Sequence, residues 1–321
     1  MTSTLPQAPS LLEIEEAHRR IFPFIHRTPV LTCQGINRVV DASIWFKCEN
    51  MQKVGAFKAR GATNAVRSLD PALLHRGVAT HSSGNHAQAL AWAAILAGVN
   101  AHIVMPSNSN RVKVEAVKTY GGEITFCKPT LEARETTLAS VIEQTGATEI
   151  HPYNNLKIIA GQATAAVELL DERDDLDFVM APVGGGGLLS GTALACHYLA
   201  PQIGVIAAEP AQADDAFRSF TQRRFIPSIN PNTIADGLRT SLGSLTFPII
   251  LTFVDRVVTV KEESIITAMR LLWERMKVVV EPSAAVPLAV LLEGNEEFRG
   301  KRIGIILSGG NADLEQLPWQ S

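Results

Sequence analysis

Short apolar runs rich in β-branched residues alternate along the chain with longer Ala-, Leu- and Glu-rich stretches. The apolar runs predict buried strands at 44–46, 78–80, 101–105, 123–127, 177–183, 204–209, 256–260 and 302–307. The stretches between them have helical spacing and predict helices at 86–97, 110–120, 131–144, 157–171, 188–199, 262–275 and 283–293. Strands that alternate with helices of this length are typical of parallel βαβ units. The pattern therefore predicts an open α/β sheet covered by helices on both faces.

Three of the loops that follow predicted strands have unusual sequences. They are His-Ser-Ser-Gly-Asn-His at 81–86, four glycines at 184–187 and Leu-Ser-Gly-Gly-Asn at 307–311. In open parallel sheets, ligands bind at the carboxyl ends of the strands, where such loops lie. We therefore expect the functional site to be built from these loops.

The four consecutive glycines, Gly184 to Gly187, lie between a predicted strand and a predicted helix. Their backbone N–H groups can approach an anion closely, and the helix N-terminus favours negative charge, so a phosphate is the expected guest. A tight turn is the structural alternative, but one or two glycines would serve it. No Walker sequence follows, and the GxGxxG fingerprint fails in every register. Glu209 ends the next strand, where a ribose-binding acid would lie, so an NAD oxidoreductase stays open as an alternative.

Lys58 begins a small-residue segment in which Lys58, Ala62, Ala65 and Leu69 share one helical face. A lysine on an apolar face loses solvation, which lowers its pKa. The neutral amine can then form a Schiff base with an aldehyde. The alternative is a first-turn lysine whose amine extends to solvent.

The acidic cluster 209–215 follows another predicted strand and offers hard oxygen ligands that suit Mg²⁺ or Ca²⁺. An ordinary acidic first turn of a helix would look the same. His81 and His86 lack metal-ligand spacing and are equally compatible with local structural roles, and Ser83 has no base assigned by the sequence.

Composition narrows the class of protein. The chain has 321 residues, 46% hydrophobic and 19% charged, with a net charge of -3, which predicts a folded protein and gives no basic footprint for nucleic acid. The longest nearly apolar stretch, 90–99, is about half of the roughly 20 residues that a membrane span needs. The first ten residues do not resemble a secretory signal. Four scattered cysteines, Cys33, Cys48, Cys127 and Cys196, predict buried reduced thiols in a cytoplasmic protein.

Five motifs in order resemble one family. They are GAFKARGA, HSSGNHAQALA, PVGGGGLLSG, ADGL and LSGGN, spread over 27–311. This arrangement is similar to the fold-type II enzymes of pyridoxal 5'-phosphate (PLP), of the tryptophan synthase β-like fold. It is most similar to their serine/threonine dehydratase and serine racemase branch. The resemblance implies a large open-sheet domain, residues 1–76 and 154–321, with a smaller mobile α/β domain inserted at 77–153.

The resemblance also implies a role for each motif residue. Lys58 would hold the cofactor covalently and act as the base at the substrate Cα, Phe57 would lie against the pyridine ring and Ser308 would face the pyridine nitrogen. The other implied cofactor contacts are Asn85, Gly184, Gly185, Gly186, Gly187, Gly237 and Glu281. The implied substrate contacts are Ser82, Ser83, His86, Arg134 and Thr240, and Ser83 would also face Cα opposite the lysine. The implied ligands of a divalent cation (Mg, Mn or Ca) are Glu209, the Ala213 carbonyl and Asp215.

The implied activity is dehydration of a 3-hydroxy amino acid to a 2-oxo acid and ammonia, with racemisation as a compatible side activity, in a homodimer. A β-replacement synthase such as a cysteine synthase, and a non-catalytic PLP- or amino-acid-binding protein, are the alternatives. Ala56, Ala163 and Ala284 depart from the family pattern and leave the substrate open among serine, threonine, 3-hydroxyaspartate and phenylserine. Arg134 matches an arginine of racemase-like members and favours a substrate with a second carboxylate. Pairing of Arg134 with Glu132 or Glu135 at the surface is the competing expectation.

Overall fold

The computed structural model describes residues 7–82, 84–109, 111–294 and 296–320. Two sheets dominate it, one of six strands in the order β1-β2-β10-β7-β8-β9 and one of four in the order β5-β4-β3-β6. All neighbouring strands are parallel except β1, which pairs antiparallel with β2. The strands are β1 Val30–Leu31, β2 Ser43–Lys47, β3 Val78–His81, β4 Ala101–Pro106, β5 Glu123–Cys127, β6 Thr148–Glu149, β7 Phe178–Pro182, β8 Gly204–Pro210, β9 Arg256–Val260 and β10 Arg302–Ile306.

The helices fill the intervals between the strands. They are α1 Leu11–Ile21, α2 Gln34–Val40, α3 Lys58–Arg67, α4 Pro71–Leu74, α5 Asn85–Ala97, α6 Arg111–Thr119, α7 Leu131–Thr145, α8 Leu156–Glu172, α9 Gly187–Leu199, α10 Asp215–Gln222, α11 Thr246–Phe253, α12 Glu262–Leu271 and α13 Pro282–Leu292. The predicted helix 262–275 corresponds to α12 and a π-helical turn, Leu272–Met276, that follows it directly; Lys277 then adopts a left-handed conformation with φ 60° and ends the helix. No described helix is long and apolar enough to cross a membrane.

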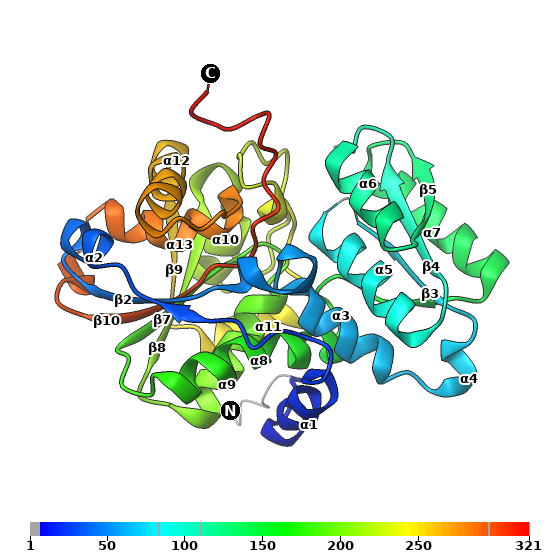
Figure 1. Cartoon of the computed structure of the whole chain (residues 1–321), viewed down its shortest axis with the longest axis horizontal. Coiled ribbons are helices and arrows are strands. Elements are labelled where there is room, and N and C mark those ends of the chain that lie inside the picture. Colours follow the sequence, from blue (N-terminus) through cyan, green and yellow to red (C-terminus); the bar gives the residue numbers. More distant parts are fainter. Residues whose placement is uncertain (1–6, 83, 110, 295, 321) are drawn as a thin grey trace.

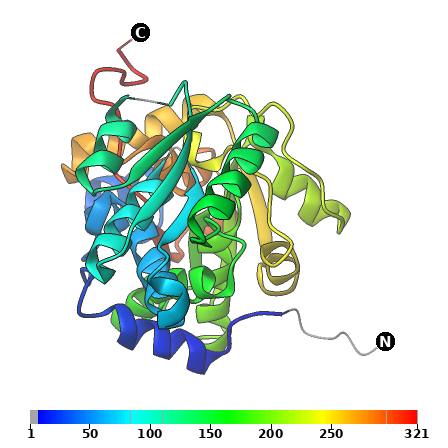
Figure 2. The same ribbon diagram turned by 90° about the vertical axis from the view of Figure 1, so that its right-hand side faces the viewer.

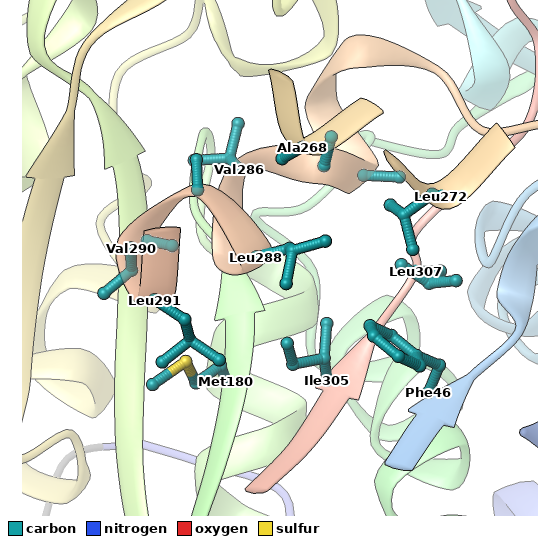
Figure 3. Packing of buried hydrophobic residues seen from close by; sticks show 14 of the residues in the cluster. Phe46, Met180, Ala268, Leu272, Val286, Leu288, Val290, Leu291, Ile305 and Leu307 are labelled. Carbon is teal, nitrogen blue, oxygen red and sulfur yellow. The ribbon is translucent and has the colours of Figure 1, made fainter. Parts of the chain in front are cut away.

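The six-stranded sheet is buried on both faces, as the unbroken apolar runs predicted (Figure 1). Successive residues of β8 point to opposite sides: Ile206 and Ala208 pack with α2, α12 and α13, whereas Val205 and Ala207 pack with α8, α9 and α11. Figure 3 shows the first of these layers, where Val286, Leu288, Val290 and Leu291 of α13 lie over Met180 and Ile305 of the strands.

The four-stranded sheet is built wholly from residues 78–149. Helices α5 and α6 cover one of its faces and α7 covers the other (Figure 2). Helix α3 joins the two halves, since its alanines pack with α5 while Gly61 lies against α8. A Cβ on Gly161 of α8 would lie 2.6 Å from the Gly61 Cα, so this close helix contact requires glycine.

The described cysteines are all free thiols. Cys48 and Cys196 are buried, as predicted, but Cys33 and Cys127 are partly exposed, so the prediction that all four are buried is wrong. Cys127 is the last residue of β5, which is an edge strand, and an edge leaves side chains open to solvent.

Candidate active site

Lys58 is the first residue of α3, and its amine turns inward. The Nζ atom donates a hydrogen bond to the carbonyl oxygen of Pro152 at 2.9 Å and lies 5.1 Å from the centre of the Phe57 ring. Burial lowers the pKa of the Lys58 amine to about 8, against the opposing charge of Glu281. The amine bonds to the protein instead of extending to solvent, although the residue as a whole is only partly buried. At a pKa of about 8, roughly a tenth of the amine is neutral at pH 7.

The glycine loop, Gly184–Gly187, runs from the end of β7 into the first turn of α9 and is buried. None of its four N–H groups donates a hydrogen bond to a described residue. Buried N–H groups without partners are rare in proteins, so this loop is ready to bind an anion at the N-terminus of α9. Its neighbours leave no room for side chains, since a Cβ on Gly185 would lie 2.2 Å from a ring carbon of Tyr153.

Ser308 follows β10 and lies beside the start of α3. Its carbonyl accepts a hydrogen bond from the Phe57 N–H at 3.0 Å, and Ala56 forms a β-bridge with Gly309. The Ser308 hydroxyl is buried and has no hydrogen-bond partner among the described residues. This hydroxyl can therefore donate to, or accept from, a ligand atom that lies near Lys58.

Asn85, the first residue of α5, connects the two halves of the molecule. Its Nδ2 donates to both carboxylate oxygens of Glu281, at 2.8 and 3.0 Å, and its Oδ1 accepts from Asn311 at 2.9 Å. Burial and the charge of Asp236 raise the pKa of Glu281 to about 7, although the Asn85 hydrogen bond opposes the shift. The Asn85 amide therefore already has protein partners at the position where the resemblance implies a cofactor contact.

The other implied contacts come from both halves. His86 is buried, its Nε2 lies 3.0 Å from the Ile150 carbonyl oxygen, and burial followed by the Lys58 charge lowers its pKa to about 3. The imidazole is therefore neutral. The Thr240 Oγ1 would lie 3.2 Å from a Cβ on Gly184, which puts Thr240 beside the glycine loop.

Two further predicted contacts lie in loops next to these groups. The Ser82 hydroxyl accepts a hydrogen bond from the Gly84 N–H at 3.3 Å, and Gly237 donates to the Ser283 hydroxyl at 3.2 Å. Ser83 lies outside the described residues.

Arg134 lies on α7, and its Nε donates a hydrogen bond to the Thr130 carbonyl oxygen at 3.4 Å. Burial lowers the pKa of His81, and the Arg134 charge lowers it further. The same charge counteracts the rise in the pKa of Tyr153 that burial causes. In the described part of the chain no carboxylate lies within ion-pair distance of Arg134, so the expected surface pairs with Glu132 or Glu135 are not formed.

Two carboxylates of the acidic cluster, Glu209 and Asp215, are buried. Each oxygen of Glu209 accepts one backbone hydrogen bond, from Ala216 at 2.9 Å and from Phe217 at 2.8 Å. The Asp215 carboxylate is buried, and neither of its oxygens meets hydrogen-bond geometry with a described residue, although the Ser228 hydroxyl partly offsets the burial that raises its pKa to about 6. Ala213 is also buried. No group of three or more His, Cys, Asp or Glu side chains around a common point is found in the described residues.

Sequence reasoning missed the segment 150–154, which follows β6 and contacts most of this site. The carbonyl of Pro152 accepts from Lys58, the carbonyl of Ile150 faces His86, and Tyr153 packs on the glycine loop. The only available clue was a His-Pro-Tyr-Asn sequence after a short apolar run, and such a run of mixed residues has no diagnostic period.

Three observations fit a phosphorylated pyridine aldehyde. The desolvated Lys58 amine suits the aldehyde, the unpartnered N–H groups of the glycine loop suit the phosphate, and the unpartnered Ser308 hydroxyl suits a ring nitrogen. Lys58 begins α3, the glycine loop joins β7 to α9, and Ser308 follows β10. The residues present thus fit PLP.

Comparison with known proteins gives the same answer. A family model described as pyridoxal-phosphate dependent enzyme matches residues 21–309. The chain is 49% identical over 311 residues to the beta-hydroxyaspartate dehydratase of Paracoccus denitrificans, covering 97% of this chain and 99% of that protein. The crystal structure of the serine racemase from Dictyostelium discoideum superposes with a TM-score of 0.90 at 50% identity, covering 95% of this chain and 99% of that one. The crystal structure of the T.th. threonine deaminase gives a TM-score of 0.91 at 43% identity, covering 95% and 99%.

These findings confirm the resemblance and overturn the NAD oxidoreductase alternative. The chain therefore belongs to the fold-type II pyridoxal-phosphate dependent enzymes, in the serine/threonine dehydratase and serine racemase branch that its motifs predicted.

Proposed function

We propose that this protein is a dehydratase of 3-hydroxyaspartate, which it converts to a 2-oxo acid and ammonia. At the level of reaction class, the chain is a PLP-dependent lyase of hydroxy amino acids, as the sequence predicted. The choice of 3-hydroxyaspartate rests on Arg134. The relative that is named for this substrate supports it.

When bound, PLP supplies the electron sink that stabilises negative charge at the substrate Cα. Lys58 is the group that removes the Cα proton, because burial brings its pKa down to about 8, close to neutral pH, and so makes a neutral fraction of the amine available as a base. The electron pair of the broken C–H bond then expels the Cβ hydroxyl, which takes up a proton and leaves as water. The released enamine tautomerises and hydrolyses to the 2-oxo acid and ammonia.

The remaining residues hold the reactants. We assign the phosphate to Gly184–Gly187 and the pyridine nitrogen to the Ser308 hydroxyl, with Phe57, Gly237, Asn85 and Glu281 around the ring. Because the Ser308 hydroxyl is uncharged, it would not stabilise a protonated ring nitrogen, and the ring would then be only a moderate electron sink. Ser82, Ser83, neutral His86 and Thr240 are assigned to the substrate.

One observation carries the substrate assignment: the charge of Arg134 acts on His81 and Tyr153, which lie beside the site, and its guanidinium has no carboxylate partner in the described part of the chain. The second carboxylate of 3-hydroxyaspartate would supply that partner through charge-assisted hydrogen bonds, which are often bidentate. Serine, threonine and phenylserine have no such group. A contact of this kind contributes about 1.5–3 kcal/mol, or roughly tenfold to a hundredfold in binding.

The test compares kcat/KM for L-serine, L-threonine, 3-hydroxyaspartate and 3-phenylserine, with 2-oxo acid and ammonia as the readout. We expect 3-hydroxyaspartate to be used at least as well as serine. Arg134→Ala should lower kcat/KM for 3-hydroxyaspartate alone by about tenfold or more, and Arg134→Lys should recover part of it. Lys118→Ala, which removes a surface charge paired with Glu115, is the matched control. A preference for phenylserine, or an Arg134→Ala variant unchanged on every substrate, would reject the assignment.

Two companion measurements address the alternatives. Formation of a new Cβ–S bond from O-acetylserine and sulfide would indicate a β-replacement synthase, and binding without turnover would indicate a non-catalytic binding protein. We also propose racemisation as a side activity, supported by the serine racemases among the relatives. Circular dichroism of recovered substrate measures it.

We further propose a divalent cation, Mg²⁺, Mn²⁺ or Ca²⁺, held by Glu209, the Ala213 carbonyl and Asp215. The buried, unpartnered Asp215 carboxylate and the lone pairs left on Glu209 support this donor set. The start of α10 at Asp215 also fits an ordinary acidic first turn, so chelation is the deciding test. A homodimer, a cytoplasmic location and a mobile domain at 77–153 complete the proposal.

A further inference from the structure

The four glycines of the loop do not by themselves fix the direction in which their peptide groups point. Glycine peptides rotate with little steric resistance, so four in a row can present either N–H or C=O groups to a ligand. A carbonyl oxygen turned toward a phosphate would repel it. A loop of this sequence therefore binds an anion well only if another group holds its peptides in one orientation.

Thr246, the first residue of α11, makes such a contact. Its side chain is fully buried, and its hydroxyl donates to the Gly185 carbonyl oxygen at 2.8 Å. The same hydroxyl oxygen accepts a hydrogen bond from the Gly243 N–H, also at 2.8 Å. A hydroxyl has one hydrogen to donate, and the Gly243 carbonyl is the more distant acceptor at 3.3 Å. The hydroxyl hydrogen is thus directed at Gly185.

Because a peptide unit is planar, the contact with the Gly185 carbonyl also fixes the direction of the Gly186 N–H group. In a trans peptide the C=O of one residue and the N–H of the next point in opposite directions. No cis peptide occurs among the described residues. With the Gly185 carbonyl held toward α11, the Gly186 N–H must point away from α11, and this is one of the N–H groups that have no partner in the described part of the chain.

Thr246 is itself held firmly. Asn154 accepts a hydrogen bond from the Leu245 N–H at 2.8 Å and donates to the Ser244 hydroxyl at 3.1 Å. A Cβ on Gly186 would lie 2.9 Å from the Thr246 Cβ, so the loop and α11 are in direct contact. A contact preorganised in this way fixes the loop before the ligand arrives.

We propose that Thr246 is a positioning residue: its hydroxyl holds the Gly185–Gly186 peptide in the orientation that binds the cofactor phosphate. This inference rests on the proposed placement of the phosphate at the glycine loop. It goes further by naming a residue outside the loop that determines the affinity of the loop for phosphate.

The experiment compares two aldehydes on the full-length chain freed of cofactor. PLP and pyridoxal both react with the Lys58 amine, but only PLP carries the phosphate. The dissociation constant of each is measured by absorbance for the original protein and for Thr246→Val, which keeps the side-chain volume and removes the hydroxyl. Thr246→Ser keeps the hydroxyl. Thr252→Val is the control on the same helix, because among the described residues the Thr252 hydroxyl bonds within α11, to Pro248 at 2.8 Å.

We expect Thr246→Val to raise the dissociation constant of PLP about tenfold, the effect of one net hydrogen bond, and to leave that of pyridoxal unchanged. Thr246→Ser should restore PLP affinity, and Thr252→Val should bind both aldehydes as the original protein does. Equal weakening of both aldehydes would show that Thr246 only supports the fold, and an unchanged PLP affinity would show that the loop needs no such contact. Either result overturns the proposal. If the original protein binds pyridoxal as tightly as PLP, the phosphate site itself is wrong.

Discussion

Glu168→Gln is expected to destabilise the protein strongly, because Glu168 belongs to a charged cluster inside the large sheet layer. Lys47, Glu49, Arg60 and Glu168 are all fully buried. Glu168 Oε2 lies 2.7 Å from the Lys47 Nζ and 2.8 Å from an Arg60 guanidinium nitrogen. Glu49 binds the other side of the Arg60 guanidinium at 2.7 Å. Two positive and two negative charges therefore balance in a region shielded from solvent.

The magnitude follows from that balance. Glu168→Gln removes one negative charge and leaves two buried cations against a single carboxylate. Removing one partner of a buried ion pair costs about 3–5 kcal/mol. Coulomb's law at an effective dielectric constant of about 20 and a separation of ~4 Å gives about 4 kcal/mol, which agrees. We expect the free energy of unfolding to fall by about 3–5 kcal/mol.

Equilibrium unfolding in urea, followed by circular dichroism and tryptophan fluorescence, measures this loss. Asp171→Asn is the matched control, since Asp171 lies on the same helix, α8, and pairs with Arg27 at 3.1 Å while its side chain is 67% exposed. An exposed pair contributes at most about 1 kcal/mol. A loss for Glu168→Gln as small as that of the control would refute the reasoning.

The pH dependence of the variant provides a second check. Burial already lowers the pKa of Lys47, and the charge of Glu168 opposes that shift. Without Glu168 the folded-state pKa of Lys47 falls further, so below the usual lysine pKa of about 10.4 the unfolded chain binds more protons than the folded one. Stability of the variant must then rise with pH in that window. The deficit relative to the original protein should narrow as the pH rises toward the ordinary lysine pKa of about 10.4. A constant deficit would contradict this assignment.

Three further outcomes are expected. Stopped-flow absorbance should show that covalent capture of PLP accelerates as the pH rises through about 8, because that is the pKa of Lys58; an increase only near the ordinary lysine value would contradict the desolvation of its amine. Gly185→Ala should raise the dissociation constant of PLP at least about tenfold, measured by fluorescence titration, because the new Cβ meets the Tyr153 ring at 2.2 Å. Burial raises the pKa of Glu209 to about 9 and of Asp215 to about 6, so with chelator the melting temperature should fall as the pH rises above the ordinary carboxyl values. Mg²⁺ should remove that fall, and melting curves that are the same with Mg²⁺ and with chelator would reject the cation site.

Local pattern alone determined most of the elements of this protein. The predicted strands 123–127 and 256–260 have the bounds of β5 and β9, and the predicted helices begin and end within one or two residues of α5, α7, α8, α9 and α13. For the interior strands β7, β8 and β10, composition suffices because a strand buried on both faces of a parallel sheet is apolar along almost its whole length. The two-residue strands β1 and β6 were missed, since a run that short has no period.

The residues assigned to the cofactor could also be found from the sequence. Lys58, the glycine loop and Ser308 lie where predicted strands end or predicted helices begin, and unusual residues at those points indicate a ligand. The motif order then predicted the family, which the comparisons confirm. The roles of the individual site residues stay predictions until the variants above are measured.

Only the tertiary structure decided which of these groups meet. It placed β10 between β2 and β7, although β10 comes last in the chain, and it brought the Thr246 hydroxyl to Gly185 across 61 residues. It also placed Tyr153 on the glycine loop and left Arg134 without the surface ion pairs that its neighbours in sequence offered. Contacts between distant segments leave no periodic trace, because each depends on how whole elements pack and not on the residues beside it.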